Sequence, residues 1–154
     1  MNREFNTRQA FNTILSVALW TAGILFFALS CLVILVSMLP LKQEQAYQVI
    51  RFQFRILVRL MGIRLTVQGE SNIVPKRTYL IMGNHESLFD FFVIPVSIPI
   101  CFVGVEAARH FSYPVFGYLI RRWGNIPIPR KNLKGAIHSL ELARETVRSG
   151  MHIG

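Results

Sequence analysis

The sequence predicts an α/β protein in which an N-terminal membrane helix, or a helical hairpin, precedes an α/β sandwich. Three observations support this fold class. An apolar run extends over residues 14–39, a segment at 44–63 mixes arginine with apolar residues, and short strand-like and helix-like segments alternate from residue 64 onwards. Charged residues make up only 16% of the 154 residues, against roughly 25% in ordinary soluble domains.

The first segment, residues 1–40, is predicted to be a membrane anchor. No charged residue occurs between Arg8 and Lys42, and a spanning helix needs about 20 apolar residues. A secretory signal would have a shorter apolar region of about 7 to 15 residues. A helical hairpin over residues 10–62 that dips into one leaflet is the alternative to a single spanning helix.

The second segment, residues 41–63, is predicted to form an amphipathic helix at the membrane interface. Arg51, Arg55 and Arg59 recur at intervals of four and therefore share one stripe of a helix. Guanidinium groups on such a stripe would face lipid phosphates. An ordinary core helix with a solvated face is the alternative. More basic residues follow the apolar run than precede it, which predicts that the remainder of the chain lies on the cytoplasmic side.

The third segment, residues 64–154, alternates between strand and helix patterns. The elements expected in order are a strand in RLTVQG, a buried strand in TYLIMGN, a strand in ICFVGV, a helix broken at Pro114, an extended NIPIP, a helix over NLKGAIHSLELARETVRSG and the start of a strand in MHIG. Asn132 is the expected N-cap of the last helix and Gly150 its stop.

The heptapeptide NHESLFD places polar residues inside an apolar stretch. His85 and Asp90 can meet only if a strand ends and a helix begins between them, and Ser87 is a candidate N-cap for that helix. An imidazole held by a carboxylate is a general base, and an alcohol is its usual proton source. A histidine that is merely hydrogen-bonded at a helix start is the equal alternative. Glu86 is expected to face solvent.

A second polar cluster, GNIPIPRK, precedes the last helix. Arg130 and Lys131 follow an extended segment and lie beside helix amides that could bind an anion, so a phosphate is a plausible ligand. A solvated basic turn is the alternative.

Other chemistries fit the sequence poorly. There is no HExxH zinc motif, G-x-S-x-G elbow, Walker loop or dinucleotide glycine pattern, and the histidines lack metal-ligand spacing. The net charge of +9 could suit nucleic acid, but the arginines cluster beside the apolar run. Membrane lipids are therefore the expected partners, with no nucleic acid and no metal.

Together these features resemble the glycerolipid acyltransferase family, which includes 1-acyl-glycerol-3-phosphate acyltransferases. NHESLFD matches the family's Asn-His-x-Ser-x-x-Asp block at every defined position, and GNIPIPRK resembles its second block with Pro129 where Asp is common. The resemblance implies acyl transfer from acyl-CoA or acyl-carrier protein to a lysophospholipid hydroxyl. In that reaction His85 is the base, Asp90 orients it, and Arg130 and Lys131 hold the phosphate. No cofactor is required.

The resemblance is incomplete at the C-terminal end. The family's third block, Phe-Pro-Glu-Gly-Thr-Arg, normally follows the strand after the last helix, and the sequence stops at Gly154 before reaching it. We therefore expect an incomplete, C-terminally truncated acyltransferase domain. The alternative function is that of a non-catalytic membrane protein that lacks the third motif.

Overall fold

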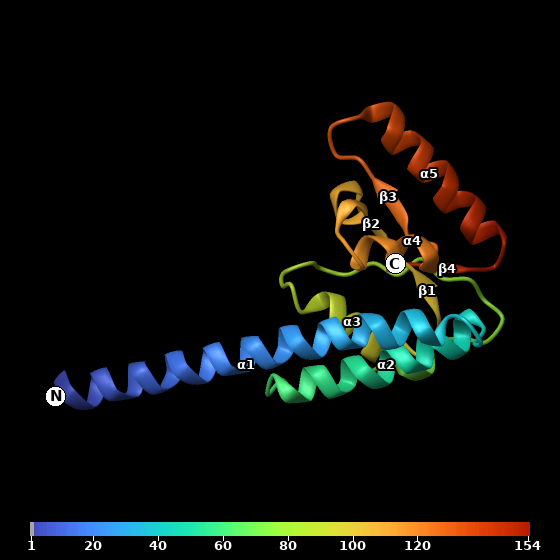
Figure 1. Ribbon diagram of the computed structural model, residues 1–154. Helices are drawn as coiled ribbons and strands as arrows, with labels where there is room; N and C mark the ends of the chain where they lie inside the picture. The colour runs from blue at the N-terminus through green and yellow to red at the C-terminus, as the bar shows by residue number, and fades with distance from the viewer. Residues whose placement is uncertain (1) are drawn as a thin grey trace.

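The computed structural model describes residues 2–154, with side chains from Thr7 onwards, and shows a helix-dominated mixed α/β protein (Figure 1). The elements, in chain order, are α1 (Asn2–Ser37), α2 (Gln43–Leu60), η1 (Glu70–Asn72), α3 (Asp90–Ser97), β1 (Phe102–Val103), β2 (Val105–Ala107), η2 (Ala108–Ser112), α4 (Phe116–Trp123), β3 (Ile126–Ile128), α5 (Leu133–Arg148) and β4 (His152–Ile153).

Helix α1 is the expected apolar helix, and Thr7–Ser37 is long and apolar enough to cross a membrane. Its two halves have different surroundings. Residues 7–18 are all exposed, and this half projects away from the rest of the chain (Figure 1). The second half packs on α2 and buries Ser30, Cys31 and Ile34.

Helix α2 runs antiparallel to α1 (Figure 1) and packs on both α1 and α3. The two long helices approach closely where α2 ends, because a Cβ at Gly23 would lie only 3.0 Å from the Met61 sulfur. One face of α2 is buried, including Tyr47, Phe54 and Leu57. This helix therefore contributes to the protein core, while an interfacial position for its exposed face stays a prediction.

A cluster of aromatic rings fixes α3 against the other helices. Phe27 of α1 lies 5.4 Å from Phe92 of α3, and Phe54 of α2 lies 5.1 Å from the same ring, both in edge-on contacts. Phe91 meets Phe116 of α4 at 5.5 Å. Such pairs stabilise by about 0.5–1.5 kcal/mol beyond the area they bury, so the start of α3 is held firmly.

The strands are short, and each pair of strands is parallel. β4 pairs with β1 and β3 pairs with β2, and β1 and β2 are one run of chain interrupted only at Gly104. On the other side of β4, Leu80 forms a parallel bridge with Ile153. The register pairs are Phe102–His152, Val103–Ile153, Val105–Ile126, Glu106–Pro127 and Ala107–Ile128.

Several predicted elements of the third segment are confirmed. The ICFVGV strand corresponds to β1 and β2, NIPIP to β3, MHIG to β4, and the Pro114 break separates η2 from α4. Helix α5 has Asn132 at its N-cap, where the side chain accepts a hydrogen bond from the Gly135 amide at 3.2 Å. Gly150 follows the helix with a φ of 90°, a conformation that favours glycine.

Two predicted strands are wrong. Residues 64–69 form no strand, and residues 78–84 form only the Leu80 bridge rather than a buried strand. Met82 is 83% exposed. The physical reason is that β4, the neighbour of this stretch, contains only two residues and pairs along only a small part of it.

Candidate functional site

The NHESLFD stretch forms a tight turn that leads into α3, and Asp90 is the first residue of that helix. One carboxylate oxygen, Oδ2, accepts three hydrogen bonds there. The donors are the His85 ring nitrogen Nδ1 at 2.8 Å, the Glu86 amide at 2.9 Å and the Ser87 amide at 3.0 Å. The turn therefore brings His85 and Asp90 together, as the sequence suggested.

The detail of the helix start differs from the prediction. Phe89 occupies the N-cap position of α3, so the assignment of Ser87 as the N-cap is wrong. The Ser87 hydroxyl instead accepts a hydrogen bond from the Phe89 amide at 3.2 Å. Asp90 reaches back to the amides that precede the helix, and an acceptor at this position is favoured because amides at a helix start lack partners.

The electrostatics of this turn keep Asp90 ionised. The Ser87 amide chiefly lowers the pKa of Asp90, and hydrogen bonds from His85 and the Glu86 amide lower it further. An ionised carboxylate only accepts hydrogen bonds, so Nδ1 of His85 must carry the proton. In the neutral ring the other nitrogen, Nε2, then has a free lone pair. The ring is 78% exposed, while the Asp90 side chain is 22% exposed.

Helix α3 is anchored to α2 by its C-terminal carbonyl groups. Arg51 donates to the Pro95 and Val96 carbonyls, both at 3.2 Å, and the Tyr47 hydroxyl donates to the Ile98 carbonyl at 2.9 Å. The two bonds from Arg51 are charge-assisted, and such bonds are stronger than those between neutral groups. Together with the aromatic cluster, they position the helix that carries Asp90.

An aromatic contact connects the turn with the projecting part of α1. Phe89, the residue before Asp90, lies 6.0 Å from the Trp20 ring. The turn that carries His85 therefore contacts the apolar helix through Phe89.

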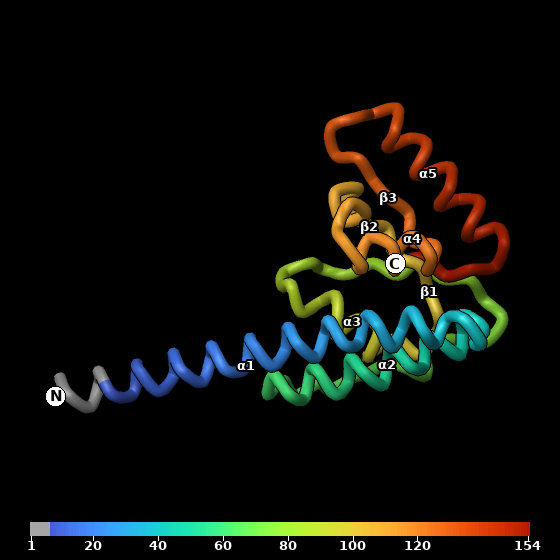
Figure 2. Tube along the Cα trace, viewed as in Figure 1, coloured from blue at the N-terminus to red at the C-terminus, as the bar shows by residue number. Residues whose placement is uncertain are grey.

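The basic pair predicted to bind phosphate lies in a different place. Arg130 and Lys131 are exposed in the turn between β3 and α5. In Figure 2 this turn is at the top of the molecule, whereas the 84–89 loop lies beside α1 and α3. Among the described side chains, neither cation makes a hydrogen bond or ion pair with the His85–Asp90 pair.

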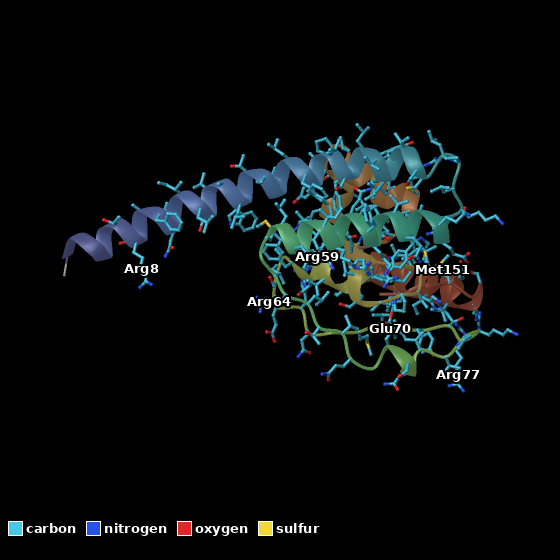
Figure 3. All side chains as sticks on the ribbon, turned by 90° about the horizontal axis from the view of Figure 1, so that it is seen from below. Arg8, Arg59, Arg64, Glu70, Arg77 and Met151 are labelled. Carbon is cyan, nitrogen blue, oxygen red and sulfur yellow. The ribbon has the colours of Figure 1, made fainter. Side chains whose placement is uncertain are left out.

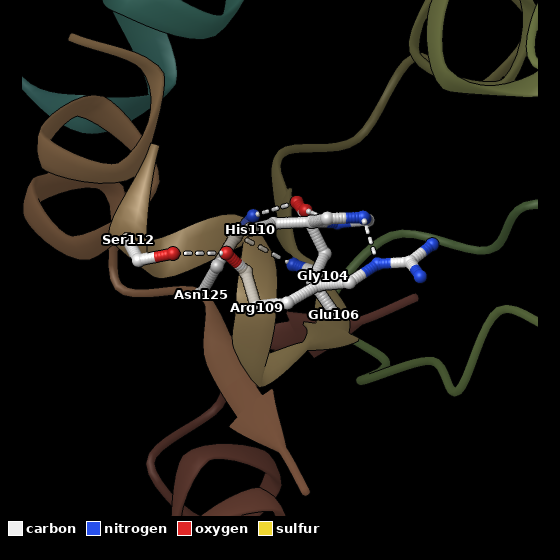
Figure 4. Close-up of polar contacts among 6 residues, drawn as sticks. All are labelled: Gly104, Glu106, Arg109, His110, Ser112 and Asn125. Atoms are coloured by element: carbon white, nitrogen blue, oxygen red, sulfur yellow. Dashed lines mark hydrogen bonds and ion pairs between the residues drawn. The ribbon is translucent and has the colours of Figure 1, made fainter. Parts of the chain in front are cut away.

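The structure contains a second histidine–carboxylate pair that the sequence reading did not identify (Figure 4). Nδ1 of His110 lies 3.2 Å from Glu106 Oε2, and Arg109 Nε donates to His110 Nε2 at 3.4 Å. Asn125 donates to Glu106 Oε1 at 2.7 Å and accepts from the Gly104 amide at 2.9 Å. The i,i+4 spacing of Glu106 and His110 is the feature of the sequence that could have indicated this pair.

The two histidines differ in the state of Nε2. In His110 this nitrogen already accepts a hydrogen bond, so both ring nitrogens have partners. In His85 only Nδ1 is engaged. A general base needs a free lone pair within reach of the proton it removes. The geometry therefore favours His85 as the base and gives His110 a role in holding β2, β3 and η2 together.

Within the described residues, no group of three or more histidine, cysteine, aspartate or glutamate side chains is placed to hold a metal ion. The prediction that the reaction needs neither a metal nor a cofactor stays a prediction.

Comparison with known proteins gives a family match and two similar relatives. Residues 64–154 match the family model described as Acyltransferase. The chain is 31% identical over 100 residues to a 1-acyl-sn-glycerol-3-phosphate acyltransferase of Cocos nucifera, covering 64% of this chain and 32% of the relative. It is 26% identical over 109 residues to a 1-acyl-sn-glycerol-3-phosphate acyltransferase of Borreliella burgdorferi, covering 71% of this chain and 44% of the relative.

The chain thus spans less than half the length of either relative. No solved structure matches it significantly.

Proposed function

Since the chain belongs to the acyltransferase family, we propose that it transfers a fatty acyl group from a thioester to a lysophospholipid hydroxyl. The acceptor is a molecule such as 1-acyl-glycerol-3-phosphate, and the donor is acyl-CoA or acyl-carrier protein. The product serves phospholipid biosynthesis. Two relatives named for this reaction support the choice of acceptor. The observation that carries the proposal is the contact of His85 Nδ1 with Asp90 Oδ2 at 2.8 Å, which leaves Nε2 free.

In the proposed reaction, Nε2 of His85 removes the proton of the acceptor hydroxyl. The oxygen forms a bond with the thioester carbonyl carbon, and the carbon–sulfur bond then breaks. The proton on His85 passes to the departing thiolate, so the enzyme ends unchanged. Asp90 holds the Nδ1 proton and stabilises the imidazolium that forms, a division of labour known for histidine–carboxylate pairs.

Arg130 and Lys131 are the proposed ligands of the acceptor's phosphate. A guanidinium group presents a planar fork of donors that matches two phosphate oxygens, and an ammonium adds a point charge. Both side chains are exposed and make no hydrogen bond or ion pair among the described residues, so they are available for an anion. This assignment requires the turn between β3 and α5 to approach the 84–90 turn when the acceptor binds.

The proposed site of action is a membrane surface. Thr7–Ser37 supplies an apolar helix of sufficient length, and the acceptor is itself a membrane lipid. The excess of Lys and Arg after this helix favours the cytoplasmic side for residues 41–154.

The test is thioester consumption with lysophosphatidate by the purified chain in membranes. We expect His85→Ala to lower kcat by roughly 10²- to 10⁴-fold, the usual contribution of a general base. His138→Ala is the matched control, because His138 is an exposed histidine on α5, and it should keep full activity. Equal activity of both variants would exclude His85 as the base. Absence of turnover by the wild-type chain would favour a non-catalytic membrane protein.

A further inference from the structure

A second basic site lies away from the His85 turn, where α2 ends. It is an open pocket of about 390 Å³ lined by the C-terminal half of α2, the stretch after α2, and the end of α3. Four arginines line it, namely Arg51, Arg55, Arg59 and Arg64, with Glu70 as the one carboxylate. No residue of the 84–90 turn and neither Arg130 nor Lys131 belongs to it.

The arginines of this pocket differ in their partners. Arg51 is committed to α3, because its guanidinium donates to two carbonyl groups there. Among the described side chains, those of Arg55, Arg59 and Arg64 make no hydrogen bond or ion pair, not even with Glu70. Like charges at i,i+4, as in Arg55 and Arg59, destabilise a helix. An anion in the pocket would remove that repulsion.

The lining of the pocket also has an apolar part. Val58, Ile63, Leu65 and Val67 contribute to its walls. A guanidinium cluster favours phosphate, since its forks match pairs of phosphate oxygens. Apolar walls beside that cluster favour a phosphate that is attached to a hydrophobic group.

The position of the pocket points to the membrane surface. Gly23 of α1 lies against Met61, so the end of α2 near which the pocket lies is packed on α1. In Figure 3, Arg59 and Arg64 lie close to the place where α1 leaves the body, and Arg8 lies far out on the projecting half. If the projecting apolar half enters a bilayer, these arginines lie at the headgroup layer, where basic residues are attracted to anionic lipids.

We propose that Arg55, Arg59 and Arg64 form a phosphate-binding pocket that holds the headgroup of an anionic phospholipid. The site is separate from the site of acyl transfer, and its occupation requires no acyl donor. It would fix how deeply α1 inserts and how the His85 turn faces the lipid surface.

The test is calorimetric titration of the full chain in uncharged detergent micelles. The titrants are short-chain phosphatidylglycerol, short-chain phosphatidylcholine and inorganic phosphate. We expect phosphatidylglycerol to bind, and the triple variant Arg55→Gln/Arg59→Gln/Arg64→Gln to weaken its affinity by at least about tenfold, because each arginine contributes charge-assisted hydrogen bonds. The matched control Arg77→Gln/Arg144→Gln/Arg148→Gln loses the same charge from exposed positions outside the pocket and should bind as the wild type does.

Two further variants separate recognition from folding and from general charge. Arg55→Lys/Arg59→Lys/Arg64→Lys keeps the charge but loses the forks, and it should bind more weakly than the wild type. Glu70→Gln removes the carboxylate of the pocket, and it should tighten binding.

Three outcomes would overturn the proposal. If the two triple glutamine variants lost the same affinity, net charge alone would explain the effect. If Glu70→Gln did not change the affinity, the ligand would not be bound in this pocket. Inorganic phosphate or phosphatidylcholine binding as tightly as phosphatidylglycerol would show that no anionic lipid headgroup is selected.

Discussion

Nδ1 of His85 lies 2.8 Å from Oδ2 of Asp90, and the same oxygen also accepts the Glu86 and Ser87 amides. The histidine is therefore held by a carboxylate that is itself held by the backbone. This arrangement fixes the ring orientation before any substrate arrives. It also separates two contributions of Asp90, its hydrogen-bond geometry and its charge.

The variant Asp90→Asn should keep the geometry and lose the charge. An amide oxygen can still accept the three hydrogen bonds, but it stabilises an imidazolium less. We expect kcat to fall by less than the roughly 10²–10⁴ expected for loss of the base, and the acid limb of the pH–rate profile to move to lower pH. Asp90→Ala should cost more activity than Asp90→Asn. Equal rates for the two variants would show that orientation of the His85 ring by residue 90 does not contribute to catalysis.

Neutral substitutions at Arg130 and Lys131 should act on the acceptor. Arg130→Gln and Lys131→Gln should each raise KM for lysophosphatidate by about tenfold or more, because charge-assisted hydrogen bonds are lost. Monoacylglycerol, an acceptor without a phosphate, should be unaffected. Lys134→Gln, on an exposed residue of the first turn of α5, is the control. A fall in kcat with unchanged KM would contradict the assignment.

Charges placed at exposed positions of α1 should weaken membrane attachment. Val17 and Ile24 are exposed, and an arginine near a membrane centre costs about 2.5–3.5 kcal/mol on insertion scales. We expect Val17→Arg/Ile24→Arg to be released from membranes by carbonate washing, whereas the wild type is retained. Leu133→Arg/Leu140→Arg on the exposed side of α5 should be retained as well. Equal retention of all three proteins would argue against insertion of α1.

Gly117→Ala should destabilise the fold. A Cβ at this position would collide with the Phe111 carbonyl group, and α4 would have to move away from η2. We expect a loss of about 1–3 kcal/mol in the free energy of unfolding, as for overpacked cores, measured by denaturant titration. Gly83→Ala is the control, since no heavy atom lies within 4 Å of its added Cβ. Similar stability of the two variants would contradict this packing.

His152 should make stability depend on pH. Its Nδ1 accepts a hydrogen bond from the Tyr79 amide at 3.1 Å, and burial lowers the pKa of His152. The unfolded chain therefore takes up the proton first as pH falls below the ordinary value of about 6.5. The stabilisation is present above that pH and is lost as pH falls towards the folded-state pKa.

We expect the thermal midpoint of the wild type to fall between pH 7.5 and pH 5.5, and His152→Gln to show a smaller fall. His138→Gln, at an exposed histidine, should keep the wild-type slope. A steeper fall of the thermal midpoint for His152→Gln than for the wild type would show that the pKa of His152 is raised by folding rather than lowered.

Part of the site could be predicted from sequence because it depends on short-range geometry. The turn that joins His85 to Asp90 spans a few residues, and its backbone amides and carboxylate find one another locally. The free state of His85 Nε2 and the occupied state of His110 Nε2 could not be predicted. They depend on side-chain conformations, which place the Arg109 guanidinium on Nε2 of the neighbouring His110 and leave Nδ1 as the only engaged nitrogen of the His85 ring.

By itself, the sequence determined the features that arise from local periodicity and capping, namely the long apolar helix, the helix after Asn132 and the order of elements from residue 100 onwards. Only the tertiary structure decided which surfaces of these elements are covered. It buries Ser139 of α5 against the Pro127 carbonyl at 2.6 Å and leaves Leu140 64% exposed. It engages Arg51 with α3 while Arg55 and Arg59, on the same stripe, face an open pocket. The physical reason is that burial depends on partners distant in sequence, whereas a helix period describes only the chain's own repeat.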